Sequence, residues 1–348
     1  MALEASGSAS EATGWVSRHL LIREGDILVA AVPLYLKSNS YGEYIFDWEW
    51  ANASHRAGLP YYPKLVSSVP FTPATGRRVL TGDRPLSVGV ARVVVDALRT
   101  LAKETAASSI HLLFVSKNEF ETLSEFDEFI PRVTYQYHWE NRGYGSFQDW
   151  LYGFRARRRK TVRRERAAVA ECGVSLSVLS GAELSEYHWS AIEDLYLNTV
   201  ERKHAYAYLS PDFFARIAES FQDNVICLIA EKAGEVVAMS LCFQSGKHLY
   251  GRYWGCRTEF RALHFEMCYH RPIELCIERG WSKFEAGAQG VHKISRGLMP
   301  SETYSLHCLA HKGLHNAVGR ATEVERKRTA REMEYLSKHG PFRRGDLE

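Results

Sequence analysis

Apolar and polar residues follow one another along the chain in an order that occurs twice. Residues 18–36, RHLLIREGDILVAAVPLYL, predict two strands around a turn at Gly25 and Asp26. Residues 225–254 predict three strands separated by short polar turns. In the first stretch an aromatic strand is expected to follow, at residues 41–50, YGEYIFDWEW. Each stretch is therefore predicted to begin with a three-stranded meander.

An amphipathic helix and a further strand are expected after each meander. Apolar residues recur at the helical period over residues 87–106 and again over residues 262–279. The apolar segments IHLLFV (110–115) and WSKFEAG (281–287) then predict strands. A meander, a helix and a strand form the core order of the acetyltransferase fold. We therefore expect an α/β (α+β) chain with two tandem GNAT-like acetyltransferase-fold domains.

Matched sequence strings favour a duplication. LVAAVPLYL (28–36) aligns with VVAMSLCFQ (236–244), and YGEY (41–44) aligns with YGRY (250–253). Downstream, RAGLPYYPKL has an echo in FRALHFEMCY. Chance similarity between short hairpins is the alternative. Three matched elements in one order, about 208 positions apart, favour a duplicated domain over a solenoid repeat.

The pattern divides the chain into four expected parts. They are an N-terminal GNAT-like domain (1–140), a basic helical junction (141–175), a C-terminal GNAT-like domain (176–312), and a C-terminal helix and tail (313–348). The junction is expected to hold a helix over residues 155–171. The helix of the last part, over residues 313–338, is interpreted as a packing helix with a solvated charged face.

Positive charge is concentrated in the junction. The chain has a formal net charge of +3, but residues 155–166, RARRRKTVRRER, hold eight basic residues against Glu165. Cations packed this densely repel one another, and a phosphate backbone relieves that repulsion. A tRNA acceptor arm is the favoured partner, with a phosphorylated small substrate or a solvated face as alternatives. The expected tRNA contacts are Arg155, Arg157, Arg158, Arg159, Lys160, Arg163 and Arg164.

Cysteine spacing and hydropathy indicate the cellular compartment in which the protein is expected. The seven cysteines are scattered and form no CxxC pair, so neither a metal site nor a redox dithiol is expected. No window approaches 18 apolar residues, and the first 15 residues lack the apolar core of a signal peptide. We therefore expect a cytoplasmic protein without membrane insertion.

The helix entry of the second domain lacks a glycine-rich loop. An acyl-CoA enzyme needs backbone N–H groups at this point to hold the pyrophosphate. No glycine occurs between Gly255 and Gly280, and the matching region of the first domain has no clustered glycines. An acyl-CoA donor is therefore disfavoured.

Several long strings resemble a known family. ALHFEM and IELCIERGWSKFEAGAQG resemble the Fem-type aminoacyltransferases, and RRRKTVRRERAAVAECGVSL resembles their junction between domains. YLKSNSYGEYIFDWEWA, YYPKL, VPFTPATG, LYGRYWG, LHFE and FEAGAQGVHKISRG resemble the FemAB-like branch of the GNAT superfamily, described as peptidoglycan biosynthesis or recognition proteins. The resemblance covers roughly residues 14–312. It implies two tandem acetyltransferase-like domains and an aminoacyl-tRNA donor.

The second domain carries polar residues suited to aminoacyl transfer. That reaction needs a proton acceptor for the amine and stabilisation of an oxyanion. The candidate catalytic residues are His264, Glu266, Glu285 and Lys293, and the candidate substrate-binding residues are Arg252, Gln289, His292 and Arg296. Structural alternatives stay open, because Glu285 can be a buried hydrogen-bonded residue and Arg296 can pair with Glu266 or Glu285.

The first domain carries aromatic and polar residues suited to an acceptor substrate. Asp47 lies between aromatic residues and is a candidate ligand for the acceptor amine, against a purely structural role. The candidate acceptor-binding residues are Lys37, Tyr41, Asp47, Trp48, Tyr62 and Lys64.

These residues support three hypotheses. The first is an aminoacyl-tRNA-dependent acyl- or aminoacyltransferase that forms an amide bond on a small-molecule or cell-wall-type amine, by direct attack and without a cofactor. A role in specialised-metabolite biosynthesis also fits this hypothesis. The second is an acyl-CoA-dependent N-acyltransferase of the same fold. The third is a non-catalytic module that binds peptidoglycan or nucleic acid.

Overall fold

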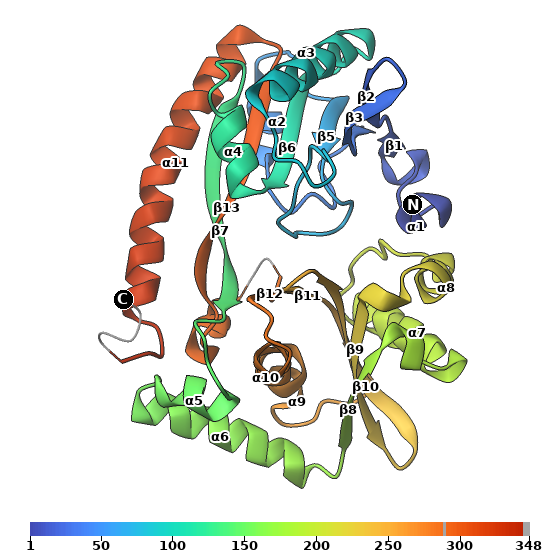
Figure 1. The fold of residues 1–348 in the computed structure, drawn as a ribbon, viewed down its shortest axis with the longest axis vertical. Coiled ribbons are helices and arrows are strands. Elements are labelled where there is room, and N and C mark those ends of the chain that lie inside the picture. The colour runs from blue at the N-terminus through green and yellow to red at the C-terminus, as the bar shows by residue number, and fades with distance from the viewer. Residues whose placement is uncertain (288–289, 344–348) are drawn as a thin grey trace.

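A computed structural model describes residues 1–287 and 290–343 of the 348-residue chain. Its main feature is an eleven-stranded sheet with the order β1-β4-β5-β6-β13-β7-β12-β11-β10-β9-β8 (Figure 1). Its strands are β1 (Trp15–Ser17), β4 (Tyr35–Lys37), β5 (Lys64–Ser67), β6 (Ser109–Val115), β7 (Ile130–Glu140), β8 (Ser175–Ser180), β9 (Val225–Lys232), β10 (Glu235–Ser245), β11 (His248–Cys256), β12 (Lys283–Glu285) and β13 (Met299–Leu309). A separate hairpin consists of β2 (Leu20–Glu24) and β3 (Ile27–Val32).

Helices cover this sheet and join its strands. They are α1 (Ala2–Ala5), α2 (Trp48–Arg56), α3 (Val88–Glu104), α4 (Lys117–Leu123), α5 (Phe147–Tyr152), α6 (Ala156–Glu171), α7 (Glu186–Arg202), α8 (Pro211–Ser220), α9 (Leu263–Phe265), α10 (Arg271–Glu278) and α11 (Lys312–Lys338). A π-helical turn, Glu266–His270, joins α9 to α10, and a 3₁₀ helix spans Val291–Arg296.

The same topological unit occurs in both halves of the sheet. In the first half, β4 runs antiparallel to β5, and α3 connects β5 to its parallel neighbour β6. In the second half, β10 runs antiparallel to β11, and α9 and α10 connect β11 to its parallel neighbour β12. The expected tandem acetyltransferase-like fold is therefore confirmed.

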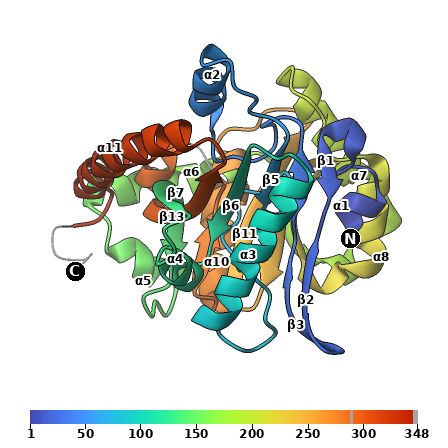
Figure 2. The same cartoon turned by 90° about the horizontal axis from the view of Figure 1, so that it is seen from above.

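Two long strands are exchanged between the halves. β13, near the end of the chain, pairs with β6 of the first half, while β7 pairs with β12 of the second half. β13 and β7 also pair with each other from Met299–His138 to His307–Ile130, which joins the halves into one sheet. Seen from above, α11 lies along β7 and β13, and α3 crosses the sheet over β6 (Figure 2).

The amphipathic helices form as the pattern predicts. Ser87 caps α3 by accepting a hydrogen bond from the Val90 N–H, and the apolar face with Ala91, Val94 and Leu98 is buried. The predictions of helices at residues 155–171 and 313–338 are confirmed by α6 and α11. The hairpin predicted within residues 18–36 is confirmed by β2 and β3.

Two predictions from the first domain are wrong. Residues 41–47 form a loop and residues 48–56 form α2, where a strand over 41–50 was expected. The loop forms because buried lysines bind it: Lys37 donates to the Tyr41 carbonyl, and Lys64 binds Asp47 directly before α2. The proposed alignment of YGEY with YGRY therefore fails.

The position of β5 in the sheet shows why that alignment fails. The strand KLVS (Lys64–Ser67) is the topological counterpart of β11, which carries YGRY, although the strings KLVS and YGRY have no residue type in common. The proposed echo between RAGLPYYPKL and FRALHFEMCY fails as well, because the first string ends in a strand and the second lies mainly in a helix.

Candidate functional site

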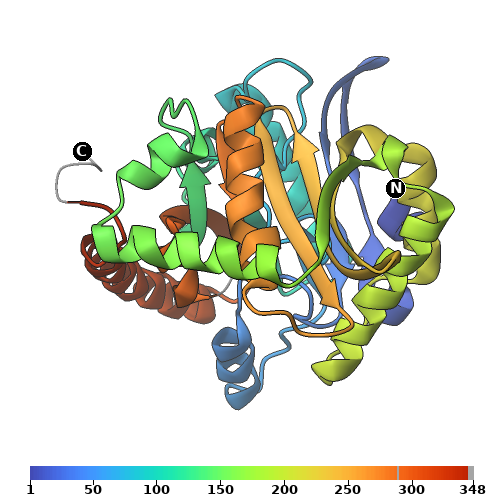
Figure 3. The ribbon, with the colours of Figure 1, turned by 90° about the horizontal axis from the view of Figure 1, so that it is seen from below.

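Helix α6 divides its charges between two faces. Seen from below, it crosses the second half over α10 (Figure 3). Its Val162 and Val169 are buried, and Arg166, on the same side, lies 3.1 Å from Glu266 and 2.7 Å from Glu274. The basic helix is therefore fixed to the second half by charged side chains as well as apolar ones.

Glu165 adds a second anchor on this inner face. Its carboxylate lies 2.8 Å from His270 Nε2 and 2.5 Å from the Arg296 guanidinium. Burial acts to raise the pKa of Glu165, but His270 and Arg296 hold it below the usual value. The single acid of the basic run thus stays ionised between the helix and the second half.

The opposite face of α6 carries unpartnered cations. Arg157, Lys160 and Arg164 are spaced three and four residues apart, which places them on one side of the helix, away from Val162. All three are exposed, and within the described residues their side chains have no hydrogen bond or ion pair. Arg158 is exposed and unpartnered as well. This face is a strip of positive charge open to solvent.

The other basic residues of the run bind protein groups. Arg155 donates to the Phe342 carbonyl at 3.0 Å, and Arg159 donates to the Phe154 carbonyl at 3.0 Å. Arg163 makes a long hydrogen bond of 3.4 Å to Gln148. The seven predicted tRNA contacts are therefore not equivalent, because Arg155 and Arg159 also hold the start of α6 in place.

A cluster of aromatic rings and imidazoles lies where β11 leads into α9. The His264 ring is 5.3 Å from Trp254, 5.4 Å from Tyr269 and 6.4 Å from His292, measured between ring centroids. The Tyr269 hydroxyl and His292 Nε2 are hydrogen-bonded at 2.9 Å. The structure thus brings together His264 and His292, which the sequence nominated separately.

Both imidazoles of this cluster are neutral at physiological pH. Burial, together with the nearby His292 and Arg296, lowers the pKa of His264 to about 4. Burial also lowers the pKa of His292, with Arg296 and Lys293 acting in the same direction. Each ring therefore keeps one nitrogen free of a proton.

Lys293 lies close enough to this cluster for its charge to lower the pKa of His264 and of His292. Its ammonium group is buried and donates to the Ala286 carbonyl at 2.7 Å and the Gly287 carbonyl at 2.9 Å. Burial lowers the pKa of Lys293 to about 8. The two hydrogen bonds from Lys293 fix the loop that follows β12. Gln289, another candidate from the sequence, lies outside the described residues.

Three further candidates of the second half are buried in contacts with protein groups. Glu266 pairs with Arg166, and Arg296 pairs with Glu165 and lies 3.3 Å from the centroid of the Phe265 ring. The alternative that Arg296 pairs with Glu266 or Glu285 is therefore wrong, because α6 supplies its partner. Glu285 is only 2% exposed and accepts a hydrogen bond from the Thr75 N–H at 3.2 Å.

A loop of the first half, residues 69–77, is held against β11 and β12. Arg252 donates to the Phe71 carbonyl, Tyr250 donates to the Thr75 carbonyl at 3.4 Å, and Glu285 accepts from the Thr75 N–H. Within the described residues, Arg252 Nε is a buried donor without a hydrogen-bond partner. Arg252 thus lies at the junction of the two halves, with one donor left for another group.

The candidate residues Lys37, Asp47 and Lys64 form a buried network with Glu43. Lys64 Nζ donates to Asp47 and, at 2.9 Å, to Glu43, while Lys37 donates to the Tyr41 carbonyl at 2.9 Å. Burial lowers the pKa of Lys37 to about 7 and raises the pKa of Glu43 to about 7. Burial also acts to raise the pKa of Asp47, but Lys64 holds it below the usual value.

This network lies behind a hollow between the two halves. The hollow has a volume of about 360 Å³ and is lined by Ala12, Thr13, Asn39, Tyr41, Phe71, Tyr206 and Tyr208. Tyr41 packs edge-on against Trp48, with ring centroids 5.2 Å apart, and Phe71 stacks on Tyr208 at 4.7 Å. Of the predicted acceptor residues, Tyr41 reaches the hollow, Trp48 packs beside it, and Tyr62 binds Ser40 at 2.8 Å.

The hollow also contains residues that the sequence did not nominate. Tyr206 and Tyr208 come from the loop between α7 and α8 of the second half, and Phe71 comes from the loop that Arg252 holds. The string AYAY at residues 205–208 places two aromatic residues in a loop, which is the signal that was available. No three His, Cys, Asp or Glu residues among those described are grouped to hold a metal ion. Within the same residues, no helix is long and apolar enough to cross a membrane.

The chain matches a known protein family and resembles several solved structures. The family model FemAB-like, described as peptidoglycan biosynthesis/recognition, matches residues 1–344. A crystal structure of FemX is similar with a TM-score of 0.55 at 11% identity, over 91% of this chain and 93% of that chain. The structure of L-PGS from Bacillus licheniformis has a TM-score of 0.54 at 10% identity, over 92% and 94%. These likenesses concern the fold. A comparison with curated proteins finds no match to the sequence.

Proposed function

This chain belongs to the FemAB-like peptidoglycan biosynthesis/recognition family, and on that premise we propose that it transfers an aminoacyl group from an aminoacyl-tRNA to an amine acceptor. The observation that carries the proposal is the division of charge on α6. Glu165 and Arg166 fix the helix to the second half, and Arg157, Lys160 and Arg164 face solvent without partners. Such a strip suits a phosphate backbone, because binding releases condensed counterions without requiring base contacts.

In this proposal the aminoacyl end of the tRNA reaches the cluster around His264. The acceptor nitrogen attacks the ester carbonyl carbon, the bond from that carbon to the ribose oxygen breaks, and an amine proton ends on the ribose hydroxyl. His264 and His292 are candidates to accept the amine proton, because burial keeps both rings neutral. Lys293 acts as a positioning residue, since its ammonium group already donates hydrogen bonds to two backbone carbonyls.

The acceptor in this proposal is an amine on a cell-wall-type or other small molecule, bound in the hollow lined by Tyr41, Phe71 and Tyr208. Aromatic walls suit the aliphatic part of such an amine and its positive charge. An acyl-CoA donor is less well supported, because the loop from Arg257 to Ala262 contains no glycine to let a pyrophosphate approach the backbone.

A tRNA-binding measurement with two matched variants tests the proposal. Changing Arg157, Lys160 and Arg164 together to Glu is expected to abolish retardation of tRNA in a native gel. The control changes Arg320, Lys327 and Arg331 of α11 to Glu, which alters net charge equally at exposed cations that are also unpartnered among the described residues. The control is expected to keep binding. Equal loss in both variants, or no loss in the first, would contradict the role of α6.

The salt dependence of binding gives a second readout of the same claim. Each phosphate contact contributes roughly 0.7 to 0.9 to the slope of log affinity against log salt. Loss of three contacts is therefore expected to reduce that slope by about 2 to 3 in a variant that changes Arg157, Lys160 and Arg164 to Gln, which removes the contacts without reversing the charge. A slope that does not change would mean that these side chains do not contact phosphates.

A further inference from the structure

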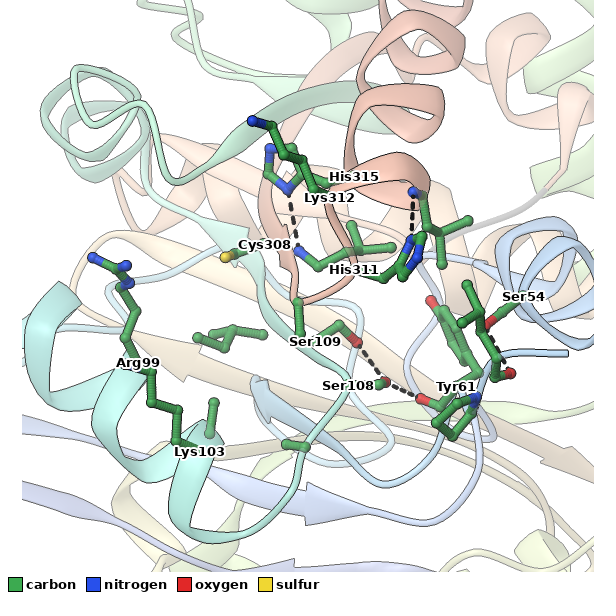
Figure 4. Close-up of a pocket in the computed structure, with 18 of the residues that line it drawn as sticks. Ser54, Tyr61, Arg99, Lys103, Ser108, Ser109, Cys308, His311, Lys312 and His315 are labelled. Atoms are coloured by element: carbon green, nitrogen blue, oxygen red, sulfur yellow. Dashed lines mark hydrogen bonds between the residues drawn. The ribbon is translucent and has the colours of Figure 1, made fainter. Parts of the chain in front are cut away.

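A cavity of about 740 Å³ lies in the first half (Figure 4). The residues that line it include none that line the hollow and none of α6. It opens at the amino ends of β5 and β6 and at the carboxyl end of β13, whereas the loop carrying Phe71 follows the carboxyl end of β5. Its volume is in the range of small-molecule sites, roughly 300 to 1,000 Å³. Much of its wall is apolar and is formed by Leu59, Pro60, Ala102, Ala107, Ile110 and Leu309.

Two lysines on the rim of this cavity have no partner. Lys103 comes from the last turn of α3 and Lys312 from the first turn of α11. Both are exposed, and among the described residues neither ammonium group has a hydrogen bond or an ion pair. The neighbouring Glu128 is already neutralised, because Arg92 lies 2.8 Å and Arg99 3.2 Å from its carboxylate.

Two histidines of the same wall add hydrogen-bond donors. His311 Nδ1 accepts the Leu314 N–H at 3.2 Å, and His315 Nδ1 accepts the Leu309 N–H at 3.3 Å. A neutral imidazole that accepts through one nitrogen carries its proton on the other, so each ring presents an Nε2–H donor. Burial lowers the pKa of His315, which keeps that ring neutral in this form.

The unpartnered polar groups of the wall are therefore mainly donors. The donors are the two ammonium groups and the two imidazole N–H groups. The wall also contains one exposed carboxylate, Asp127, which has no hydrogen bond or ion pair among the described residues. Donors without acceptors favour a ligand rich in acceptor oxygens, and the apolar wall favours a hydrocarbon body.

We propose that this cavity binds an organic anion with an apolar body, a carboxylate or a phosphate monoester whose charged end meets Lys103 or Lys312, which lie on opposite sides of the cavity (Figure 4). The hydrocarbon part lies against Ala102, Ile110 and Leu309, where it displaces water from apolar surface. The site is separate from the aminoacyl-transfer site and does not depend on it.

Calorimetric titration with octyl phosphate, below its micelle concentration, tests the proposal. We expect saturable binding at one site per chain, with octanoate as a second ligand of the same class. Octanol and inorganic phosphate, which each carry only half of the recognised chemistry, are expected to bind at least about tenfold more weakly. Absence of saturable binding by both octyl phosphate and octanoate would overturn the proposal.

Charge-reversal variants locate the binding. The variant Lys103→Glu/Lys312→Glu is expected to bind octyl phosphate at least about tenfold more weakly. The control Lys117→Glu/Lys247→Glu changes net charge equally at exposed lysines outside this cavity and is expected to bind like the unmodified protein. Circular dichroism confirms that both variants are folded. Equal affinity of both variants, for octyl phosphate and for octanoate, would place the ligand elsewhere and overturn the proposal.

Discussion

Glu165 and Arg296 form an ion pair of 2.5 Å although they are 131 positions apart in the sequence. Glu165 is the single acid in the basic run of α6, and Arg296 ends the 3₁₀ helix beside the His264 cluster. The pair therefore connects the helix proposed to bind tRNA with the site proposed to perform the transfer. It also explains why an acid lies among eight basic residues: it faces inward, to a cation of the second half.

Changing Glu165 to Gln is expected to destabilise the protein by about 3 kcal/mol, because Arg296 would keep its charge in a buried position without a partner. The free energy of unfolding from urea titration measures this. Glu171→Gln, at an exposed residue of the same helix, is the matched control and is expected to change stability by less than about 0.5 kcal/mol. Similar values for both variants would mean that the pair contributes little.

Lys37 is expected to make stability rise with pH. Its pKa is about 7 in the folded protein, below the usual 10.5, because the side chain is buried. Between these values the unfolded chain binds one proton more than the folded chain, so the free energy of unfolding increases from about pH 7 to 10.5. Below pH 7 both states bind this proton, so the free energy of unfolding no longer depends on pH through Lys37.

Comparison with Lys37→Met isolates that effect. Urea midpoints measured at several pH values are expected to rise more steeply from neutral to alkaline pH in the unmodified protein than in Lys37→Met. Taking the difference between the two proteins cancels the titrating groups that do not interact with Lys37; Glu43, whose pKa the Lys37 charge lowers, is the exception. Parallel curves would show that Lys37 keeps its ordinary pKa in the folded state.

Local pattern was enough to predict several of the helices, since α3, α6 and α11 depend on features within about 30 residues. The exchange of β7 and β13 was not predictable in this way. Its register, such as Thr303 opposite Thr134, is set by pairing between distant segments. The misaligned repeat has the same origin, because topology makes KLVS at residues 64–67 the counterpart of β11 while letter similarity points to YGEY.

The candidate site was predictable to a similar degree. The sequence identified His264 and His292 as candidates, and their rings lie close together in the structure. It did not show that Glu165 would pair with Arg296 and that Arg166 would pair with Glu266. A helix that is charged on all sides does not reveal which charges face the protein. Tyr206 and Tyr208 were missed because two aromatic residues in a short loop form no helical or strand periodicity.

His264 is expected to remain neutral through the physiological range. Burial, aided by neighbouring cations, lowers its pKa from 6.5 to about 4. In a proton NMR titration, the His264 ring signal is expected to stay constant from about pH 5.5 to 8. The signal is assigned by its loss in His264→Gln. A midpoint near 6.5 would contradict the neutral role proposed for this ring.

Arg252 is expected to hold the loop at residues 69–77 against the second half. Changing Arg252 to Met removes the donor that binds the Phe71 carbonyl, so the loop should open more often. Limited trypsin digestion is expected to cut after the exposed Arg77 several-fold faster in this variant. Arg257→Met, which alters an exposed arginine just after β11, is the control. Unchanged cleavage at Arg77 would show that Tyr250 and Glu285 suffice to hold the loop.

The hollow between the halves is expected to govern acceptor binding separately from tRNA binding. Tyr41 and Tyr206 line it with side chains that are 62% and 75% exposed, so truncating them to Ala leaves the core intact. Loss of two aromatic contacts is expected to raise KM for a diamine acceptor about tenfold while tRNA retardation stays the same. Tyr187→Ala, at an exposed tyrosine on α7 outside the hollow, is the control. An unchanged KM would mean that the acceptor binds elsewhere. A change in tRNA binding would mean that tRNA also contacts the hollow, because the tyrosines lie in its wall and not on α6.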